Sequence, residues 1–220
     1  EMCIRDRVSG FESILTMNTG AEAVETAIKA ARRWGYFSKG IPEDKAEIIV
    51  ANGNFHGRTT TIVSFSSDAS YKDGFGPFTP GFNSAEYCGS CDCQSIDSCL
   101  SIESFEKKIN KNTCAILVEP IQGEAGIRVP TDGWLKQLRD LCTSRNILLI
   151  LDEIQSGLGR TGKLFAYEHE NIKPDGLILG KALGGAILPI SAFLSSKEIM
   201  NHFNPGSHGS TFGGNPLASK

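Results

Sequence analysis

A lysine and an aspartate each follow a short apolar run that predicts a buried strand. Lys181 follows the run 177–179, directly after Gly180, and Asp152 follows the run 147–151. Ligands of open parallel sheets bind beyond the carboxyl ends of the strands, so both side chains are candidates for chemistry. We expect an active-site lysine to be partly desolvated, which lowers its pKa and makes the neutral amine a nucleophile toward an aldehyde. Taken alone, Lys181 is equally well explained as the start of a surface turn.

Asp152 narrows the choice of chemistry. A carboxylate at the end of an adjacent strand can keep a pyridine nitrogen protonated, which makes pyridoxal phosphate (PLP) an electron sink. An aspartate after a strand is more often only a cap for the next helix. A lysine and an aspartate at two strand ends are a more specific pair, and we expect them to act together.

A third candidate element is the junction before Gly20. Thr19 and Glu22 have the spacing of a capping box, and apolar residues follow at helical spacing, so the sequence predicts a helix of about four turns from Gly20. The free N–H groups and positive dipole end of a helix N-terminus suit a phosphate. Most helix caps hold no ligand, so this signal is weak alone.

The elements that must position these residues form an alternating pattern. Short runs rich in Ile, Leu and Val predict strands at 47–51, 114–119, 147–152, 176–179 and 188–194, and the apolar spacing around 134–142 predicts a helix. Such alternation indicates an α/β fold, with a mostly parallel central sheet and helices on both faces. We interpret residues 66–98, which show no sustained period, as a long surface excursion.

Composition excludes several classes of protein. The chain has 220 residues and a formal net charge of -3, with no basic run dense enough for a phosphate backbone, so we expect no nucleic-acid partner. No apolar run approaches the ~18 residues of a membrane-spanning helix. Residues 1–7 carry mixed charges and do not resemble a secretory signal. We leave residues 1–10 unassigned.

Seven cysteines, an odd number, suggest reduced thiols and an intracellular compartment. Four of them crowd one polar stretch, at Cys88, Cys91, Cys93 and Cys99. A zinc or iron–sulfur site is an open alternative there. Their confinement to one short segment, with no histidine nearby, favours a protein without a metal.

Seven segments together resemble one family. They occur in that family's order and spacing: MNTGAEAVETAIKAARRWGY (17–36), GNFHGRTTT (53–61), YKDGFGPFTPGF (71–82), VEPIQGEAGI (118–127), LDEIQSGLGRTGKLFA (151–166), LGKALGG (179–185) and NPGSHGSTFGGNP (204–216). They resemble the class III aminotransferases, which are PLP-dependent enzymes of fold type I. Each motif alone is weak, but seven in order are specific.

The resemblance implies a role for each matching residue at the cofactor. Lys181 would hold PLP as a Schiff base and carry a proton during transamination. Asp152 would bond the pyridine nitrogen, and Gln155 the phenolic oxygen. The remaining cofactor contacts would come from Phe55 on the ring face, the backbone of Gly20 and Ala21 at the phosphate, and Ser210 and Thr211 at the phosphate of a neighbouring subunit. The active sites would therefore be shared across a homodimer.

The resemblance also implies the substrates. Arg58 would bind a substrate carboxylate, with Glu119 and Glu124 as acidic residues beside the substrate. Motif detail lies closest to the ornithine branch, so we expect transfer of the δ-amino group of ornithine to 2-oxoglutarate, giving glutamate 5-semialdehyde and glutamate. Acetylornithine or another ω-amino acid, such as 4-aminobutyrate, is the alternative donor, and a non-catalytic scaffold is the alternative outside enzymes.

Residues 11–220 would then be part of the PLP-binding large domain. We expect the family's N-terminal segment and small C-terminal domain to lie outside this sequence. The expected compartment is the cytoplasm or the mitochondrial matrix.

Overall fold

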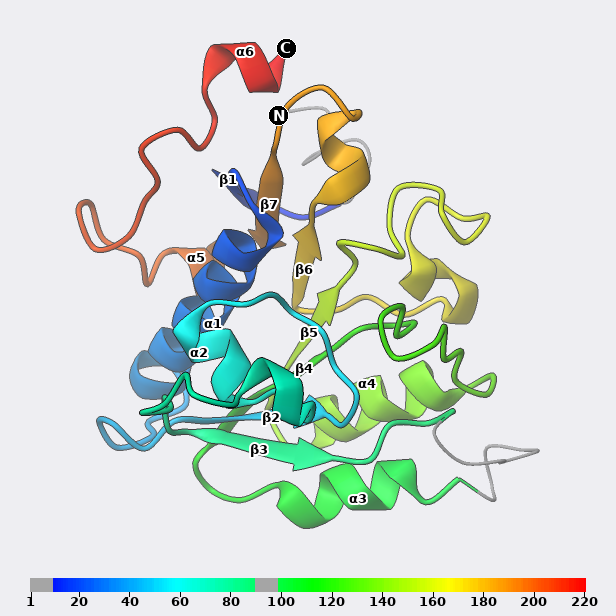
Figure 1. Cartoon of the computed structure of the whole chain (residues 1–220). Coiled ribbons are helices and arrows are strands. Elements are labelled where there is room, and N and C mark those ends of the chain that lie inside the picture. The colour runs from blue at the N-terminus through cyan, green and yellow to red at the C-terminus, as the bar shows by residue number, and fades with distance from the viewer. Residues whose placement is uncertain (1–9, 90–98) are drawn as a thin grey trace.

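One seven-stranded sheet organises the chain. The computed structural model describes residues 10–89 and 99–220. Within them the strand order is β1-β7-β6-β5-β4-β2-β3 (Figure 1). The strands are β1 (Ser13–Met17), β2 (Glu47–Ala51), β3 (Phe82–Ala85), β4 (Thr113–Val118), β5 (Leu148–Asp152), β6 (Gly176–Leu179) and β7 (Ser191–Ser195). Neighbours from β3 to β6 run parallel, whereas β7 is antiparallel to both β6 and β1. The predicted mostly parallel α/β sheet is confirmed.

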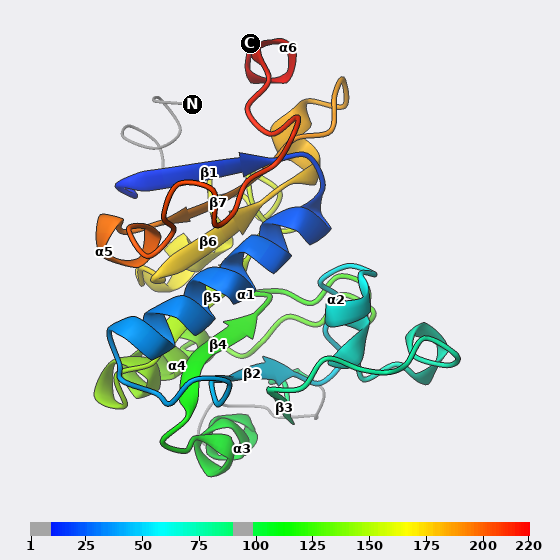
Figure 2. The same ribbon diagram turned by 90° about the vertical axis from the view of Figure 1, so that its left-hand side faces the viewer.

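Helices cover both faces of this sheet, as predicted. One face carries α1 (Gly20–Phe37), α2 (Thr60–Ser64) and α5 (Lys197–Met200), and the other carries α3 (Ser101–Lys108) and α4 (Trp134–Ser144) (Figure 2). Three 3₁₀ helices, η2 (Ala69–Tyr71), η4 (Ala166–Glu170) and η5 (Lys181–Gly184), and the short α6 (Pro216–Ser219) complete the described elements. Two apolar clusters therefore sandwich the sheet, which explains why β4 is buried along its whole length.

The chain begins α1 as its sequence predicts. The Thr19 side chain accepts from the N–H of Glu22, and the Glu22 carboxylate accepts from the N–H groups of Asn18 and Thr19. This reciprocal pairing satisfies donors that no helical carbonyl can reach. The helix starts at Gly20 and is one turn longer than expected.

Two predictions about the chain path are wrong. The stretch 66–98 is more than a surface excursion, because β3 lies within it and pairs in parallel with β2. Its sequence, FNSA, lacks the apolar run by which buried strands are recognised, since β3 is an edge strand. The last strand begins at Ser191 instead of Leu188, and residues 188–190 belong to no helix or strand.

None of the helices in the described ranges is long and apolar enough to cross a membrane.

The contact between β6 and β7 provides a test of this packing. A Cβ added at Gly176 would lie 2.7 Å from the Phe193 ring, so Gly176→Ala should overpack the core and destabilise the protein by roughly 1–3 kcal/mol. Gly209→Ala is the matched control, because a Cβ there meets nothing within 4 Å. Denaturant unfolding of the two variants measures the difference, and equal midpoints would contradict the packing described.

Candidate active site

The carboxyl ends of three parallel strands converge on one cavity. Glu119 follows β4, Asp152 ends β5 and Lys181 follows β6, and all three line a cavity of about 200 Å³. Four other predicted residues share its lining: Gly20, Ala21, Phe55 and Gln155. The structure thus brings seven of the predicted site residues together, from segments far apart in the sequence.

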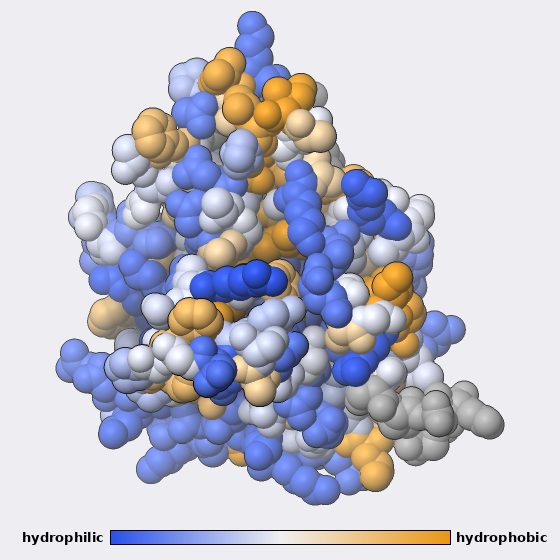
Figure 3. All heavy atoms as spheres, in the orientation of Figure 1, coloured by the Kyte–Doolittle hydropathy of each residue, from blue (hydrophilic) through white to orange (hydrophobic). Residues whose placement is uncertain are grey.

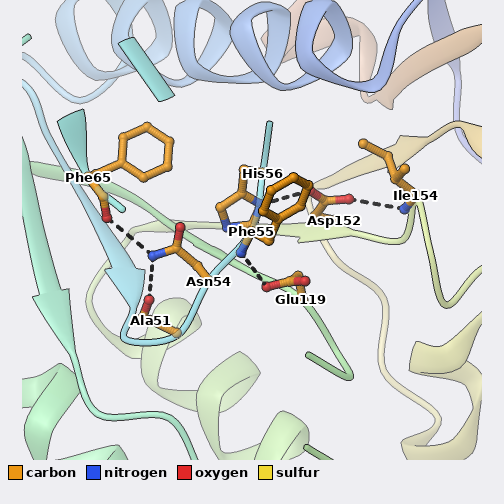
Figure 4. Close-up of polar contacts among 8 residues, drawn as sticks. All are labelled: Ala51, Asn54, Phe55, His56, Phe65, Glu119, Asp152 and Ile154. Atoms are coloured by element: carbon orange, nitrogen blue, oxygen red, sulfur yellow. Dashed lines mark hydrogen bonds and ion pairs between the residues drawn. The ribbon is translucent and has the colours of Figure 1, made fainter. Parts of the chain in front are cut away.

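Asp152 is fixed from both sides of its carboxylate. One oxygen, Oδ2, lies 2.7 Å from His56 Nδ1, and the other, Oδ1, accepts from the backbone N–H of Ile154 at 3.0 Å (Figure 4). The carboxylate is buried, with 4% of the residue exposed. Two hydrogen-bond donors on a buried carboxylate hold its orientation.

His56 is the buried partner of this carboxylate. Burial alone would lower the pKa of His56, but the hydrogen bond to Asp152 and the charges of Asp152 and Glu119 raise it above its ordinary value. Its Nε2 has no hydrogen-bond partner among the described residues. With Nδ1 protonated, His56 donates to Asp152 and stabilises its negative charge.

Glu119 is a second buried carboxylate in the cavity. It accepts from the backbone N–H of Phe55 at 3.1 Å (Figure 4). Burial and the charge of Asp152 raise the pKa of Glu119 to about 7, although His56, Phe55 N–H and Lys181 act in the opposite direction. Glu119 can therefore gain or lose a proton near neutral pH.

Lys181 sits in an uncommon backbone conformation. Its φ is +42°, in the left-handed region that a side chain with a Cβ rarely adopts, at the start of η5. Such strain concentrates at functional sites. The expected partial desolvation of Lys181 is wrong for this chain, because the residue is exposed. It lies beyond the end of β6, and the turn that follows η5, residues 185–187, is exposed as well.

The N-terminus of α1 forms another wall. Within the described part of the chain, the N–H groups of Gly20 and Ala21 donate to no other residue. A Cβ at Gly20 would lie 2.8 Å from Ile154 Cδ1, so the N-terminus of the helix packs closely against the Ile154 side chain. Two unpaired N–H groups at a helix N-terminus form a ready site for an anion.

Four predicted residues do not line the cavity. Arg58 is exposed beside it, with its guanidinium carbon 5.8 Å from the centre of the Phe55 ring. Glu124 is exposed on the loop after β4. Ser210 Oγ accepts from Asn18 Nδ2 at 3.0 Å, near the start of α1, and Thr211 is exposed. Their predicted roles remain predictions.

The cysteine cluster lies partly outside the described residues, which exclude Cys91 and Cys93. Cys88 and Cys99 are buried free thiols, with contacts to Thr131 and Ser101. No group of metal-ligating side chains occurs within 10–89 and 99–220. The metal alternative for the whole cluster stays a prediction.

His56 is not among the site residues predicted from the sequence. It stands in the segment GNFHGRTTT, next to Phe55, so its position in a matched motif was a usable signal. Its partner is 96 residues away on another element, and no local pattern reveals such a pairing.

Comparison with known proteins agrees with this geometry. Residues 3–220 match the family described as "Aminotransferase class-III". The chain belongs to this family. An ornithine aminotransferase of Brevibacillus brevis is 58% identical over 210 residues, covering 96% of this chain and 50% of that protein. Ornithine aminotransferase 2 of Staphylococcus aureus is 57% identical over 212 residues, with the same coverage. The chain spans about half the length of these curated relatives.

Solved structures show the same fold. The ornithine aminotransferase of Toxoplasma gondii superposes with a TM-score of 0.87 at 48% identity, covering 96% of this chain and 47% of that chain. An acetylornithine aminotransferase of Elizabethkingia anophelis gives a TM-score of 0.76 at 46% identity, with 96% and 46% coverage. The fold is therefore that of the fold-type I aminotransferases.

The raised pKa of Glu119 predicts how stability depends on pH. A carboxyl group with a raised pKa stabilises the fold at low pH, and that contribution is lost as pH rises from the unfolded pKa toward about 7. Glu119→Gln stays neutral, so at pH 8 it should unfold a few degrees above the parent protein, and at pH 5 at nearly the same temperature. Glu103→Gln, on the exposed surface of α3, is the control. A pH-independent difference for Glu119→Gln would contradict the burial argument.

Proposed function

We propose that the protein that carries this chain is a PLP-dependent ornithine:2-oxo-acid aminotransferase. The observation that carries the proposal is the meeting of Lys181, Asp152 and the free N–H groups of Gly20 and Ala21 in one cavity. Each group matches one part of PLP: an amine for the aldehyde, a carboxylate for the ring nitrogen, and backbone donors for the phosphate. A structure of the Toxoplasma gondii enzyme is described with PLP partially occupying its active site.

The residues of the cavity fit this cofactor. Phe55 and Ile154 contribute apolar surface suited to an aromatic ring, and Asp152 is a buried carboxylate held in place by two donors. Gln155 supplies an amide at the rim. The N-terminus of α1 adds anion-binding donors without a charged side chain.

Bound PLP would draw the electrons of the reacting bond of the substrate into its ring. The chain's own part is to keep the ring nitrogen charged and to move a proton. Asp152 performs the first task, and His56 helps by donating to Oδ2. Lys181 performs the second, because it is the amine that lines the cavity. The carboxylate and the amine that these two roles need both line the cavity.

The assignment of ornithine as donor rests on the relatives. The ornithine aminotransferases reported above share 57–58% of residues with nearly the whole chain. The guanidinium of Arg58 lies beside Phe55, where it would hold a carboxylate, and Glu119 lines the cavity. Acetylornithine is the second candidate donor, because the acetylornithine aminotransferase of Elizabethkingia anophelis shares 46% identity and the fold.

We propose a homodimer with shared active sites, in which Ser210 and Thr211 reach the neighbouring subunit's phosphate. Apolar surface gathers toward the C-terminal end of one face (Figure 3). Ile187, Phe212 and Leu217 are large apolar residues with 68–85% exposure. Contiguous exposed apolar surface is typical of a subunit interface.

The test is an absorbance spectrum of the full protein with PLP, recorded before and after adding ornithine. The PLP-loaded protein should show a visible absorbance band, and adding ornithine should remove that band. Glutamate 5-semialdehyde should then be trapped as the product. Lys181→Ala should lose both the band and transamination, because no other lysine lines the described cavity.

If acetylornithine removes the band and ornithine does not, the protein would instead be an acetylornithine aminotransferase. The absence of any band would overturn the proposal in favour of a non-catalytic scaffold.

A further inference from the structure

Two aromatic rings flank the guanidinium of Arg58. Its central carbon lies 5.8 Å from the centre of the Phe55 ring and 5.1 Å from that of Tyr71. The two rings contact each other edge to face, with centres 5.8 Å apart. The cation therefore lies within the cation–π range of both aromatic faces, beside the cavity that Phe55 lines.

The N–H groups of this guanidinium are not used elsewhere. Among the described residues, Arg58 makes no hydrogen bond and no ion pair, and it is exposed. Arginines elsewhere in the chain do make such contacts: Arg139 pairs with Asp175 and Arg145 with Glu106. Rings contact a guanidinium without occupying its donors, so Arg58 is held while its five N–H groups stay available.

The backbone under Arg58 is fixed on both sides. His56 is buried against Asp152, and a Cβ at Gly57, where φ is +126°, would lie 2.9 Å from the Cβ of Ala21. Thr59 caps α2 by accepting from the N–H of Ile62 and also donates to Glu25. The backbone is thus set, and the freedom that remains is in the long side chain of Arg58.

Tyr71 is itself well anchored, although it belongs to the irregular stretch after α2. It closes η2, whose start is capped by the Asp68 side chain accepting from Ser70 N–H at 2.8 Å. The next residue, Lys72, donates to the carbonyl of Ser64 at the end of α2. These contacts fix the chain on both sides of Tyr71, whose ring lies against Phe55 and Arg58.

We propose that Tyr71 is a specificity-determining positioning residue: its ring face, with that of Phe55, holds Arg58 so that the guanidinium edge can bind a substrate carboxylate. The inference rests on the proposed function and deepens it. A planar guanidinium can bind a carboxylate through two parallel hydrogen bonds, which demands a defined orientation. Tyr71 would thus favour donors that carry a carboxylate over amines that lack one.

The experiment compares Tyr71→Leu with Tyr71→Phe in the PLP-loaded full protein. The paired donors are ornithine and 1,4-diaminobutane, which differ only by the carboxylate. Tyr71→Leu should raise the KM for ornithine roughly tenfold, with kcat and the kinetics of 1,4-diaminobutane nearly unchanged. Tyr71→Phe keeps the ring face and should stay within about twofold of the parent protein.

A second readout does not depend on turnover. Phenylglyoxal modifies accessible arginines, and glutarate, a simple dicarboxylate, should protect Arg58 in the parent protein and in Tyr71→Phe. Protection should weaken in Tyr71→Leu, as read by mass spectrometry of the peptide that contains Arg58. This readout holds whether or not ornithine is the donor.

Three results would overturn the proposal. The first is that Tyr71→Leu keeps both the preference for ornithine and the glutarate protection of Arg58. The second is that Tyr71→Leu loses activity equally with ornithine and with 1,4-diaminobutane. The third is that Tyr71→Phe loses as much activity with ornithine as Tyr71→Leu does. If the parent protein does not turn over ornithine, the proposed function fails, and the glutarate protection alone then decides the role of Tyr71.

Discussion

Two carboxylates, Asp152 and Glu119, are buried at the carboxyl edge of the sheet. Their burial is unfavourable, and the neighbouring residues of the site must compensate for it. A buried charge is strongly disfavoured unless it is paired or hydrogen-bonded. His56 and the Ile154 N–H are hydrogen-bonded to Asp152, whereas burial raises the pKa of Glu119 to about 7. The same edge thus holds one carboxylate fixed in orientation by two hydrogen bonds and another that can exchange a proton near neutrality. Two such neighbours suit a site that must hold a charge and also transfer protons.

The parallel sheet makes this arrangement possible. Because β4, β5 and β6 run in one direction, their carboxyl ends lie at one edge, where the strand-end residues share a cavity. The N-terminus of α1 reaches the same cavity, where Gly20 packs closely against Ile154. The proposed cofactor site is therefore formed by the topology and by a few residues at strand ends.

Much of this could be predicted from the sequence. The buried strands are continuous apolar runs, and the start of α1 carries its own capping box, so their local signals are strong. Lys181 and Asp152 were found because each follows such a run. The edge strand β3 was missed, since FNSA has no apolar run, and the exposure of Lys181 depends on a turn conformation that the sequence does not encode locally.

His56 and Tyr71 show a second limit of prediction from a single sequence. Each acts through a partner in three dimensions, His56 through Asp152 and Tyr71 through Arg58. A single sequence gives the residue types but not which distant side chains meet. The motif resemblance implies the roles of the matched residues. The contacts that support those residues can be identified only in the structure.

We propose that Lys181 is the residue to which PLP attaches. Borohydride reduction of the PLP-loaded full protein, followed by peptide mass spectrometry, would locate the attachment covalently. We expect a pyridoxyl group on the peptide that contains Lys181, and no label on Lys181→Ala. A label on any other lysine, or none on the loaded protein, would contradict it.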